Sequence, residues 1–511
     1  MYESTLSLMP VRLSSFETIG LDSELVTVEI DMSPGLPSLM IVGLGDTSVQ
    51  ESKQRIRSAL RNSGVSWPKG KKITINLAPA DIKKIGPRYD LPMALGILLI
   101  TKFLDIDPAV FTDTVFIGEL ALDGSLRHVS GVLPITLSAR QRGLKRIVVP
   151  YSNGPEASLV PGIEVIAPKS LSDLVQILSR EIEAPVIKPL ASAPHAINKV
   201  PIDFEDVCGQ HQAKRALEIA AAGGHNVLMS GAPGAGKTLL AKAFRGILPP
   251  LTREEALEVT QIYSVADLLP REVPLIKERP FRCVHHTASG VSIVGGGKRP
   301  SPGEISLAHH GVLFLDELAE FPPNVMEVLR QPLEDRCITI TRASGSFTFP
   351  ANFILVAAMN PPKYCSPASA KRMHRRLSAP LLDRIDLTID VQSVDVEDLQ
   401  RKNAKSGESS SVILERVANA RERQQKRFKK TPIQINTQMD VRAVEKLCSL
   451  DEESEKLLVQ AVRRLGFSAR AYHRTIKVAR TIADLENSDV INQSHIAEAL
   501  QYRQDIGVGV S

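Results

Sequence analysis

Hydrophobic positions in the first part of the chain follow two different periods. Apolar runs that suit strands, such as ELVTVEI (24–30) and LMIVGL (39–44), alternate with segments in which apolar residues recur at helical spacing. One such segment, SVQESKQRIRSALRNSG (48–64), has serine near its start and Gly64 after its last helical residue, which are typical helix boundaries. The pattern predicts a mixed α/β domain over residues 1–180.

The hydrophobic pattern changes twice further along the chain. The segment EAPVIKPLASAPHAINKVP is rich in proline and alanine and poor in periodicity, so we predict a linker over residues 181–201. The polar segment RKNAKSGESSS (401–411) marks a second break. We expect residues 202–400 to form a second α/β domain, and residues 412–511, where helical periodicity dominates, to form a small helical domain.

The composition is that of an ordinary globular protein. The 511 residues are too many for one hydrophobic core, and 43% are hydrophobic while 23% are charged. The net charge of +5 permits contact with an acidic polymer but does not by itself indicate one. Five cysteines lie far apart without a CxxC pair, which favours reduced thiols in a cytoplasmic protein over a disulfide frame or a zinc site. We expect no secretion signal, and no membrane span because an apolar stretch of about 18 residues is missing.

The strongest motif is a phosphate loop in NVLMSGAPGAGKTLLAKAF (226–244). It matches G-x-x-x-x-G-K-[ST] and lies between an apolar strand and a helix, so a glycine-rich turn without a ligand is the weaker interpretation. Backbone N–H groups of such a loop surround phosphate oxygens, and the helix N-terminus adds positive potential. We expect Lys237 to reach the β- and γ-phosphates of ATP and Thr238 to bind Mg²⁺. The predicted loop comprises Gly231, Ala232, Pro233, Gly234, Ala235, Gly236, Lys237 and Thr238.

Further polar residues follow two later apolar strands. GVLFL ends in Asp316 and Glu317; we expect Asp316 to hold Mg²⁺ and Glu317 to orient and activate the attacking water. An acidic pair at a strand end is common, but downstream of a phosphate loop it favours hydrolysis. NFILVAAMNP ends in Asn360, whose amide can sense the γ-phosphate. Arg384 in LLDRIDL and Arg470 in SARAYHRTIKVAR complete the candidate set.

These residues, in this order, resemble the AAA+ ATPases. FRCVHHTASGVSIVGGGKRPSPGE and LRQPLEDRCITITRASGSFTFPANFILVAAMNP resemble the magnesium-chelatase-like subgroup, and the whole chain is similar to the ComM/YifB family. The resemblance implies a Lon-protease-like α/β domain, a phosphate-loop AAA+ α/β core and a C-terminal helical lid. It also implies that Arg384 is the arginine finger for a neighbouring subunit's nucleotide and that Arg470 is the second sensor. The alternative to these functional roles is that Arg384 and Arg470 cap helices or form ion pairs at the surface.

The resemblance also bears on peptidase activity. In the Lon-like fold a serine follows a glycine-proline corner and a lysine acts as its base from a later helix. Here Arg88 follows Gly86-Pro87, and Leu133 stands at the matching lysine position. An aliphatic side chain cannot take a proton, so we predict no peptidase activity. For Arg88 a salt bridge to Asp90 or another carboxylate is favoured over a phosphate contact.

A metal centre formed by protein side chains alone is not predicted. Many relatives carry a cysteine-rich insert after the asparagine strand, whereas this chain keeps only Cys365 there. The pairs His285-His286 and His309-His310 contain adjacent residues, which point in different directions on a helix or a strand. We therefore expect each pair to supply at most one ligand and interpret these histidines as polar core or interface residues.

Two basic segments are candidates for contact with DNA. The helix at 414–430 carries seven Lys/Arg against two Glu, but a solvated face or a subunit contact explains it equally well. The loop GGGKRPSPGE presents Lys298 and Arg299 between the two ATP motifs. The resemblance implies that this insertion and a hairpin near TRASGSFTF (341–349) project into the pore of a ring. Basic pore loops would grip a phosphate backbone without reading sequence.

Two functions remain open. The first is a hexameric homo-oligomeric ring that uses ATP and Mg²⁺ to move single-stranded, duplex or branched DNA, extending heteroduplex in recombination and transformation, as the resemblance implies. The second is a chelatase-type ATPase that remodels a protein partner for metal insertion. Chelatase motor subunits are expected to lack a Lon-like N-terminal domain, so the sequence favours the DNA motor.

Overall fold

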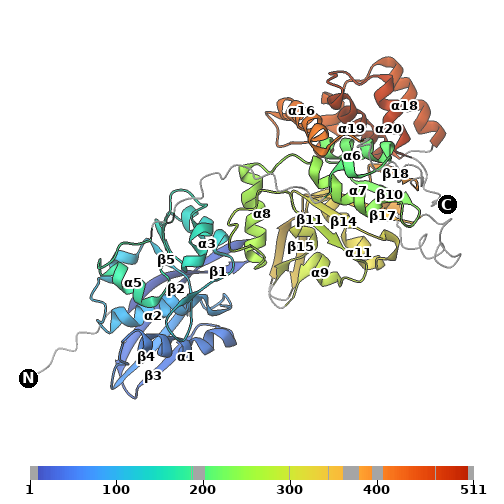
Figure 1. Cartoon of the computed structure of the whole chain (residues 1–511). Helices are drawn as coiled ribbons and strands as arrows, with labels where there is room; N and C mark the ends of the chain where they lie inside the picture. Colours follow the sequence, from blue (N-terminus) through green and yellow to red (C-terminus); the bar gives the residue numbers. More distant parts are fainter. Residues whose placement is uncertain are drawn as a thin grey trace, which may run out of the picture. The chain divides into compact units, whose positions relative to one another are not determined.

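The computed structural model describes most of the chain, namely residues 10–185, 187, 202–297, 300–342, 345–360, 379–393, 407–465 and 468–503. Its contacts divide the chain into two compact units. The first contains Met1–His195 and Ala256–Ile276, and the second contains Ala196–Glu255 and Lys277–Ser511 (Figure 1). Among the described residues, no helix is both long enough and apolar enough to cross a membrane.

The first unit is built on a mixed sheet. In its described part, seven strands follow the order β3-β4-β2-β1-β5-β8-β9. Strand β2 pairs antiparallel with β1 and with β4, and the other neighbours are parallel. The strands are β1 (Val11–Ile19), β2 (Asp22–Pro34), β3 (Ser38–Val42), β4 (Lys71–Ala78), β5 (Thr114–Phe116), β8 (Arg146–Val148) and β9 (Glu164–Ile166), with a small hairpin of β6 (Glu119–Leu120) and β7 (Leu126–Arg127).

Helices pack on this sheet as the sequence predicts. They are α1 (Thr47–Asn62), α2 (Asp90–Ile100), α3 (Val132–Gln141), α4 (Gly154–Ala157) and α5 (Leu171–Leu178) (Figure 1). Helix α1 is the helix predicted at 48–64, and its N-cap is Asp46, whose carboxylate accepts a bond from Val49 N at 3.0 Å. Helix α2 is apolar on all sides and every one of its residues is buried, as expected of a core helix. The predicted mixed α/β class is confirmed.

A segment from the middle of the chain packs with the first unit. Helix α8 (Arg253–Val265) carries Ser264, whose carbonyl accepts a bond from Gly131 N at 3.1 Å and whose hydroxyl donates to Glu156 at 2.5 Å. Gln261 of the same helix donates to the carbonyl of Leu21 at 2.8 Å. Residues 256–276 therefore belong to the first unit, whereas the residues before and after them in the sequence belong to the second. The limits of the predicted domains stay a prediction.

The second unit is built on a parallel sheet. In the part of this unit that the structure describes, five strands follow the order β11-β14-β17-β10-β18, and all pairings are parallel. They are β10 (Val227–Gly231), β11 (Phe281–Val284), β14 (Val312–Leu315), β17 (Ile354–Met359) and β18 (Leu387–Val391). Every residue of β10, β14 and β17 is buried, because helices cover both faces of such a sheet and its strands read as continuous apolar runs.

Shorter elements surround this sheet. The helices are α6 (His211–Gly223), α7 (Lys237–Phe244), α9 (Gly290–Val294), α10 (Glu304–Leu307), α11 (Pro323–Val328), α12 (Arg330–Asp335) and α14 (Ala379–Leu382). Two antiparallel pairs are β12 (Gly295–Gly296) with β13 (Ser301–Pro302) and β15 (Cys337–Arg342) with β16 (Gly345–Pro350). The hairpin predicted near 341–349 is thereby confirmed.

The C-terminal part of the second unit is helical, as predicted. It contains α16 (Ser410–Phe428), α17 (Val441–Leu447), α18 (Glu452–Leu465), α19 (Ala469–Leu485) and α20 (Gln493–Gln501). Helices α16 and α19 pack on α6, and their apolar residues join the same core cluster as β10 and β17 (Figure 1). We call these helices the lid. The lid and the parallel sheet therefore share one hydrophobic core.

Candidate nucleotide site

The carboxyl edge of the parallel sheet collects the predicted ATP residues. Strand β10 runs into the loop that precedes α7, β14 runs into Asp316 and Glu317, and β17 runs into Asn360. Two glycines of the loop are dictated by geometry. A Cβ on Gly231 would lie 2.2 Å from the carbonyl oxygen of Val391, and Gly236 has a φ of 91°, in the left-handed region. Gly231 thus lets β18 approach closely, and Gly236 lets the chain turn into α7 without strain.

Lys237 lies at the centre of the site. Its ammonium donates to the carbonyl oxygens of Gly231 at 2.8 Å and Ala232 at 2.9 Å, and to Oδ1 of Asn360 at 3.0 Å. These bonds engage the three donors of the ammonium group, and burial lowers the pKa of Lys237. The phosphate loop and the end of β17, which are far apart in sequence, therefore meet around one cation.

Thr238 and Asp316 also meet. The Thr238 hydroxyl donates to Oδ2 of Asp316 at 3.0 Å. Mg²⁺ prefers oxygen ligands at about 2.1 Å in octahedral geometry, so two adjacent ligands lie about 3.0 Å apart. The hydroxyl and the carboxylate therefore fit the Mg²⁺ site that the sequence predicts.

Glu317 is held in an unusual conformation at the end of β14. Its φ of 53° lies in the left-handed region, where a non-glycine residue is strained, and its side chain is 49% exposed. Oε2 of Glu317 lies 3.0 Å from Nδ1 of His286, which follows the neighbouring strand β11. Backbone strain of this kind clusters at functional sites.

His286 is the residue beside this site that the sequence interpretation missed. The rings of His285 and His286 lie with centroids 4.1 Å apart, and one ligand atom from each comes within 4.8 Å of a Glu317 oxygen. The expectation that adjacent histidines point apart is therefore wrong for this pair, because the chain turns directly after β11. A polar pair following the strand beside the acidic strand was the available signal. The rings of His309 and His310 also lie close, with centroids 4.0 Å apart, so the expectation is wrong for that pair too. His309 is buried, and its Nδ1 accepts a bond from Asn352 N at 3.0 Å.

Arg384 and Arg470 lie elsewhere in the second unit. The carbonyl of Arg384 accepts a bond from the side chain of Asn226, the residue before β10, at 3.0 Å. This is the amino edge of the sheet, one strand length of roughly 16 Å from the phosphate loop. Arg384 forms an ion pair with Glu334, whose other oxygen lies 3.5 Å from Arg470. The Arg384 guanidinium lowers the pKa of Glu334. The two predicted arginines are thus brought together on one carboxylate that the sequence did not single out.

The glycine-proline corner of the first unit is a packed structural element. Arg88 is buried and donates to the Thr18 hydroxyl at 2.6 Å, while Asp90 pairs with Arg55 at 2.6 Å. The expectation of a salt bridge between Arg88 and Asp90 is therefore wrong, because Asp90 forms its ion pair with Arg55 of α1 instead. Leu133 is fully buried in an apolar cluster of the same unit.

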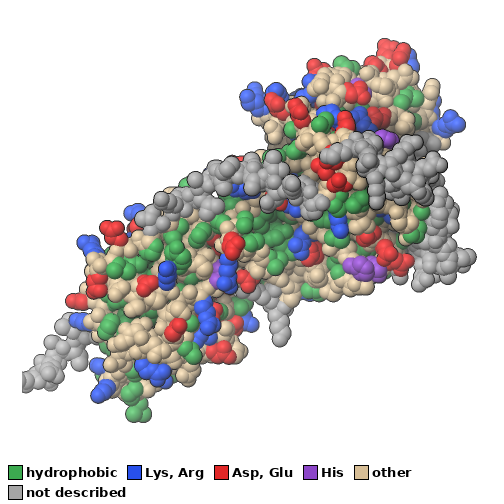
Figure 2. All heavy atoms as spheres, in the orientation of Figure 1, with side chains coloured by type: hydrophobic (Ala, Val, Ile, Leu, Met, Phe, Trp, Pro, Cys, Tyr) green, Lys and Arg blue, Asp and Glu red, His purple; other side chains and the backbone are tan. Residues whose placement is uncertain are grey.

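The two basic segments differ in what the structure describes. Lys298, Arg299 and Cys365 lie outside the described residues. On helix α16, three of the four arginines of the basic segment form ion pairs within the unit: Arg416 with Glu218 and Glu408, Arg423 with Asp489, and Arg427 with Asp484. On the face drawn in Figure 2, basic and acidic side chains are interspersed. The α16 cluster is thus largely neutralised by its own chain.

Family models match three consecutive parts of the chain. Residues 203–399 match a model described as magnesium chelatase, subunit ChlI. Residues 28–153 match one described as subunit ChlI of Mg-chelatase, and residues 407–503 match the C-terminal model of magnesium chelatase subunit ChlI. Since the first-unit model carries the chelatase description too, an N-terminal domain does not by itself separate the two functions.

Individual proteins are similar over almost the whole chain. Competence protein ComM of Haemophilus influenzae is 44% identical over 499 residues, which are 95% of this chain and 96% of that protein. The uncharacterized protein YifB of Escherichia coli is 42% identical, with 95% of each chain covered. Lon protease 2 of Bacillus subtilis is 32% identical over 126 residues, 24% of this chain and 22% of the protease.

Proposed function

The chain belongs to the magnesium-chelatase-like AAA+ ATPase family of the ComM and YifB proteins, and from this premise we propose that it is an ATP-driven ring motor that moves DNA. The observation that carries the ATPase part is the convergence of Lys237, the phosphate-loop carbonyls and Asn360 on one edge of the sheet. Family membership supports ATP as the nucleotide and Mg²⁺ as its metal.

Each residue of the site has a separate task in this proposal. Lys237 exchanges its carbonyl partners for the β- and γ-phosphates when ATP binds, which replaces neutral bonds with stronger charge-assisted ones. Thr238 and Asp316 hold Mg²⁺, which supplies charge neutralisation at the phosphates. Glu317 takes a proton from the attacking water, and the Asn360 amide orients that water.

The remaining arginines complete the site from a second copy of the chain. Arg384 and Arg470 lie at the sheet edge opposite their own phosphate loop, so within one subunit they do not reach that nucleotide. In a ring, this edge of one subunit faces the nucleotide of the next. We therefore propose a homo-oligomeric ring, hexameric as in the family resemblance, in which both arginines stabilise the transition state of the neighbour.

DNA contact is proposed for the two hairpins of the second unit. A Cβ on Gly296 would lie 2.7 Å from the Arg342 guanidinium, so β12–β13 and β15–β16 lie side by side. In the described part of the chain, no carboxylate pairs with Arg342. Lys298 and Arg299, which lie outside the described residues, stand between β12 and β13 in the sequence. The printed name of ComM, a competence protein, supports DNA as the substrate.

A chelatase-type ATPase that remodels a protein partner is the second candidate, because all three matching family models carry the chelatase name. The rate of ATP hydrolysis with and without single-stranded, duplex and branched DNA separates the two. Stimulation by DNA supports the motor. Equal rates with every DNA would favour the protein-remodelling function.

A further inference from the structure

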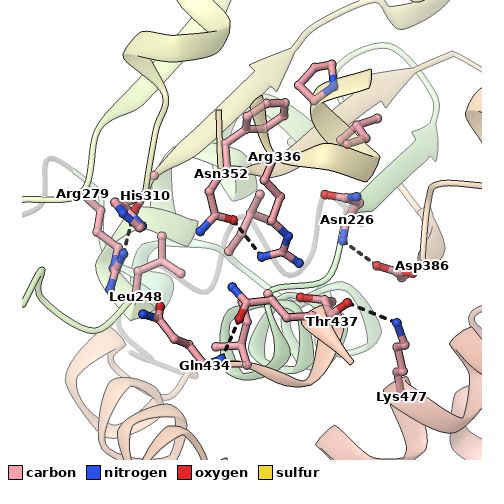
Figure 3. Close-up of a pocket in the computed structure, with 18 of the residues that line it drawn as sticks. Asn226, Leu248, Arg279, His310, Arg336, Asn352, Asp386, Gln434, Thr437 and Lys477 are labelled. Atoms are coloured by element: carbon pink, nitrogen blue, oxygen red, sulfur yellow. Dashed lines mark hydrogen bonds between the residues drawn. The ribbon is translucent and has the colours of Figure 1, made fainter. Parts of the chain in front are cut away.

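A cavity of about 120 Å³ lies within the second unit, at the amino edge of its parallel sheet. It is lined by Asn226, Asn352 and Asp386, which precede β10, β17 and β18. The lid helix α19 contributes Lys477 to the lining (Figure 3). The phosphate loop follows the opposite ends of these strands. The cavity is therefore separate from the nucleotide site of the same subunit.

The wall of this cavity carries an excess of positive charge. Among the described residues, five arginines and one lysine line the cavity together with two carboxylates; Arg384 also pairs with Glu334, and Arg474 lies 3.8 Å from Asp386. The cationic residues are Arg279, Arg336, Arg384, Arg421, Arg474 and Lys477. Both carboxylates are already engaged. Glu255 pairs with Arg279 at 3.0 Å and lies 3.4 Å from His310, and Asp386 accepts a bond from Asn226 N at 3.2 Å.

Three of the cations bind only neutral acceptors. Arg336 donates to Oδ1 of Asn352 at 3.0 Å, and Lys477 donates to the Thr437 carbonyl at 3.2 Å, as Figure 3 shows. Arg421 donates twice to the carbonyl of Ala221, at 2.7 and 3.1 Å. Within the described chain, neither Arg336 nor Arg421 forms a direct ion pair with a carboxylate, although Asp386 and Glu255 act on them from a greater distance.

Burial lowers the pKa values of two of these guanidinium groups, although a nearby carboxylate opposes each shift, namely Asp386 for Arg336 and Glu255 for Arg421. Burial lowers the pKa of Arg336 to about 10 and that of Arg421 to about 9, and the nearby charge of Arg279 contributes to the second shift. Taking charge out of water without a counter-charge is costly. A protein that keeps such a cluster gains when an anion enters it.

We propose that this cavity binds a phosphate-class oxoanion, inorganic phosphate or pyrophosphate, and that the anion joins the lid to the core. Guanidinium groups match phosphate oxygens in pairs, and those that line this cavity include Arg336 directly after α12, Arg421 of α16 and Arg474 of α19. A volume of about 120 Å³ leaves room for a phosphate-sized anion. The lid helices and the sheet edge then share a ligand in addition to their apolar core.

The test must keep phosphate out of the nucleotide site. It uses the full chain with Lys237→Ala, which weakens the phosphate loop at the other sheet edge, and titrates phosphate and pyrophosphate separately by calorimetry at constant ionic strength in chloride. We expect saturable binding of at least one anion and a rise in the melting temperature that chloride does not give. Absence of both effects overturns the proposal.

Substitutions then locate the site. Arg336→Met and Arg421→Met should each weaken anion binding about 10- to 100-fold, the loss expected for one charge-assisted hydrogen bond. Arg423→Met is the matched control, because Arg423 lies on the same helix as Arg421 but pairs with Asp489. Both cavity variants lose a charge that has no direct ion pair and should melt in chloride no lower than the control. Unchanged affinity in the two cavity variants would refute the site, whereas ATP hydrolysis by the wild-type chain tests the proposed motor independently.

Discussion

Replacing Glu317 with glutamine should stop turnover while leaving ATP binding intact. Glutamine has the size of glutamate, so the φ of 53° and the proximity to His286 can be kept, but its amide cannot accept a proton from water. The left-handed backbone costs about 1–2 kcal/mol for either residue, so that cost cancels in the comparison. The contact of the half-exposed carboxylate with His286 contributes at most about 1 kcal/mol.

The catalytic effect is larger than these structural terms. Loss of a positioned general base lowers a rate by about 10²–10⁴, which corresponds to about 2.7–5.4 kcal/mol of transition-state stabilisation. We expect kcat to fall by this factor while the Kd for ATP changes less than about fivefold, since a change of 1 kcal/mol corresponds to roughly that factor. The assay follows phosphate release under saturating ATP and measures the Kd separately with a fluorescent ATP analogue.

Glu320→Gln is the matched control for this experiment. Glu320 is an exposed carboxylate three residues further along, in the same short helix that follows Glu317. It should keep the wild-type rate. Wild-type turnover in Glu317→Gln would refute the assignment of the base, and so would a loss of ATP binding as large as the loss of rate, because the residue would then act in binding or folding.

Three further predictions concern other parts of the chain. Lys237→Ala should weaken ATP binding about 10- to 100-fold, measured by the same titration, and an unchanged Kd would contradict its role at the phosphates. Lys298→Ala with Arg299→Ala should keep basal ATP hydrolysis. In a plot of the logarithm of DNA affinity against the logarithm of salt concentration, the slope should fall by about one unit for each DNA phosphate that the variant no longer neutralises. A wild-type slope in this variant, with a reduced slope in an Arg423→Ala control, would place DNA on α16 instead. The purified protein should not cleave unfolded polypeptides with or without ATP, and cleavage that copurifies with it through further chromatography would overturn this expectation.

Much of the fold was predictable because its features are carried by consecutive residues in the sequence. The uninterrupted apolar runs of β10, β14 and β17 are buried on both faces, so their sequence already identifies a parallel core. The phosphate loop is a local motif, because Gly236 and Gly231 are required by the turn and by the close approach of β18. Since polar residues follow parallel strands, their convergence at one sheet edge also followed from the sequence.

Pairings between distant residues were not predictable in the same way. The pairing of Asp90 with Arg55, rather than with Arg88, depends on how α1 packs against α2. The meeting of Arg384 and Arg470 on Glu334 depends on where the lid lies on the core. Neither has a fixed sequence spacing. The cationic cavity is of the same kind, because its arginines come from separate elements that only tertiary packing brings together.

The most direct test of the motor is movement of DNA that depends on hydrolysis. A branched DNA with one labelled strand is incubated with the protein, and release of that strand is followed with ATP, with a non-hydrolysable analogue, and with Glu317→Gln. We predict release only by the wild-type protein with ATP, together with faster ATP hydrolysis when the branched DNA is present. A labelled strand that stays in place while ATP is hydrolysed at the same rate with and without DNA would contradict the account.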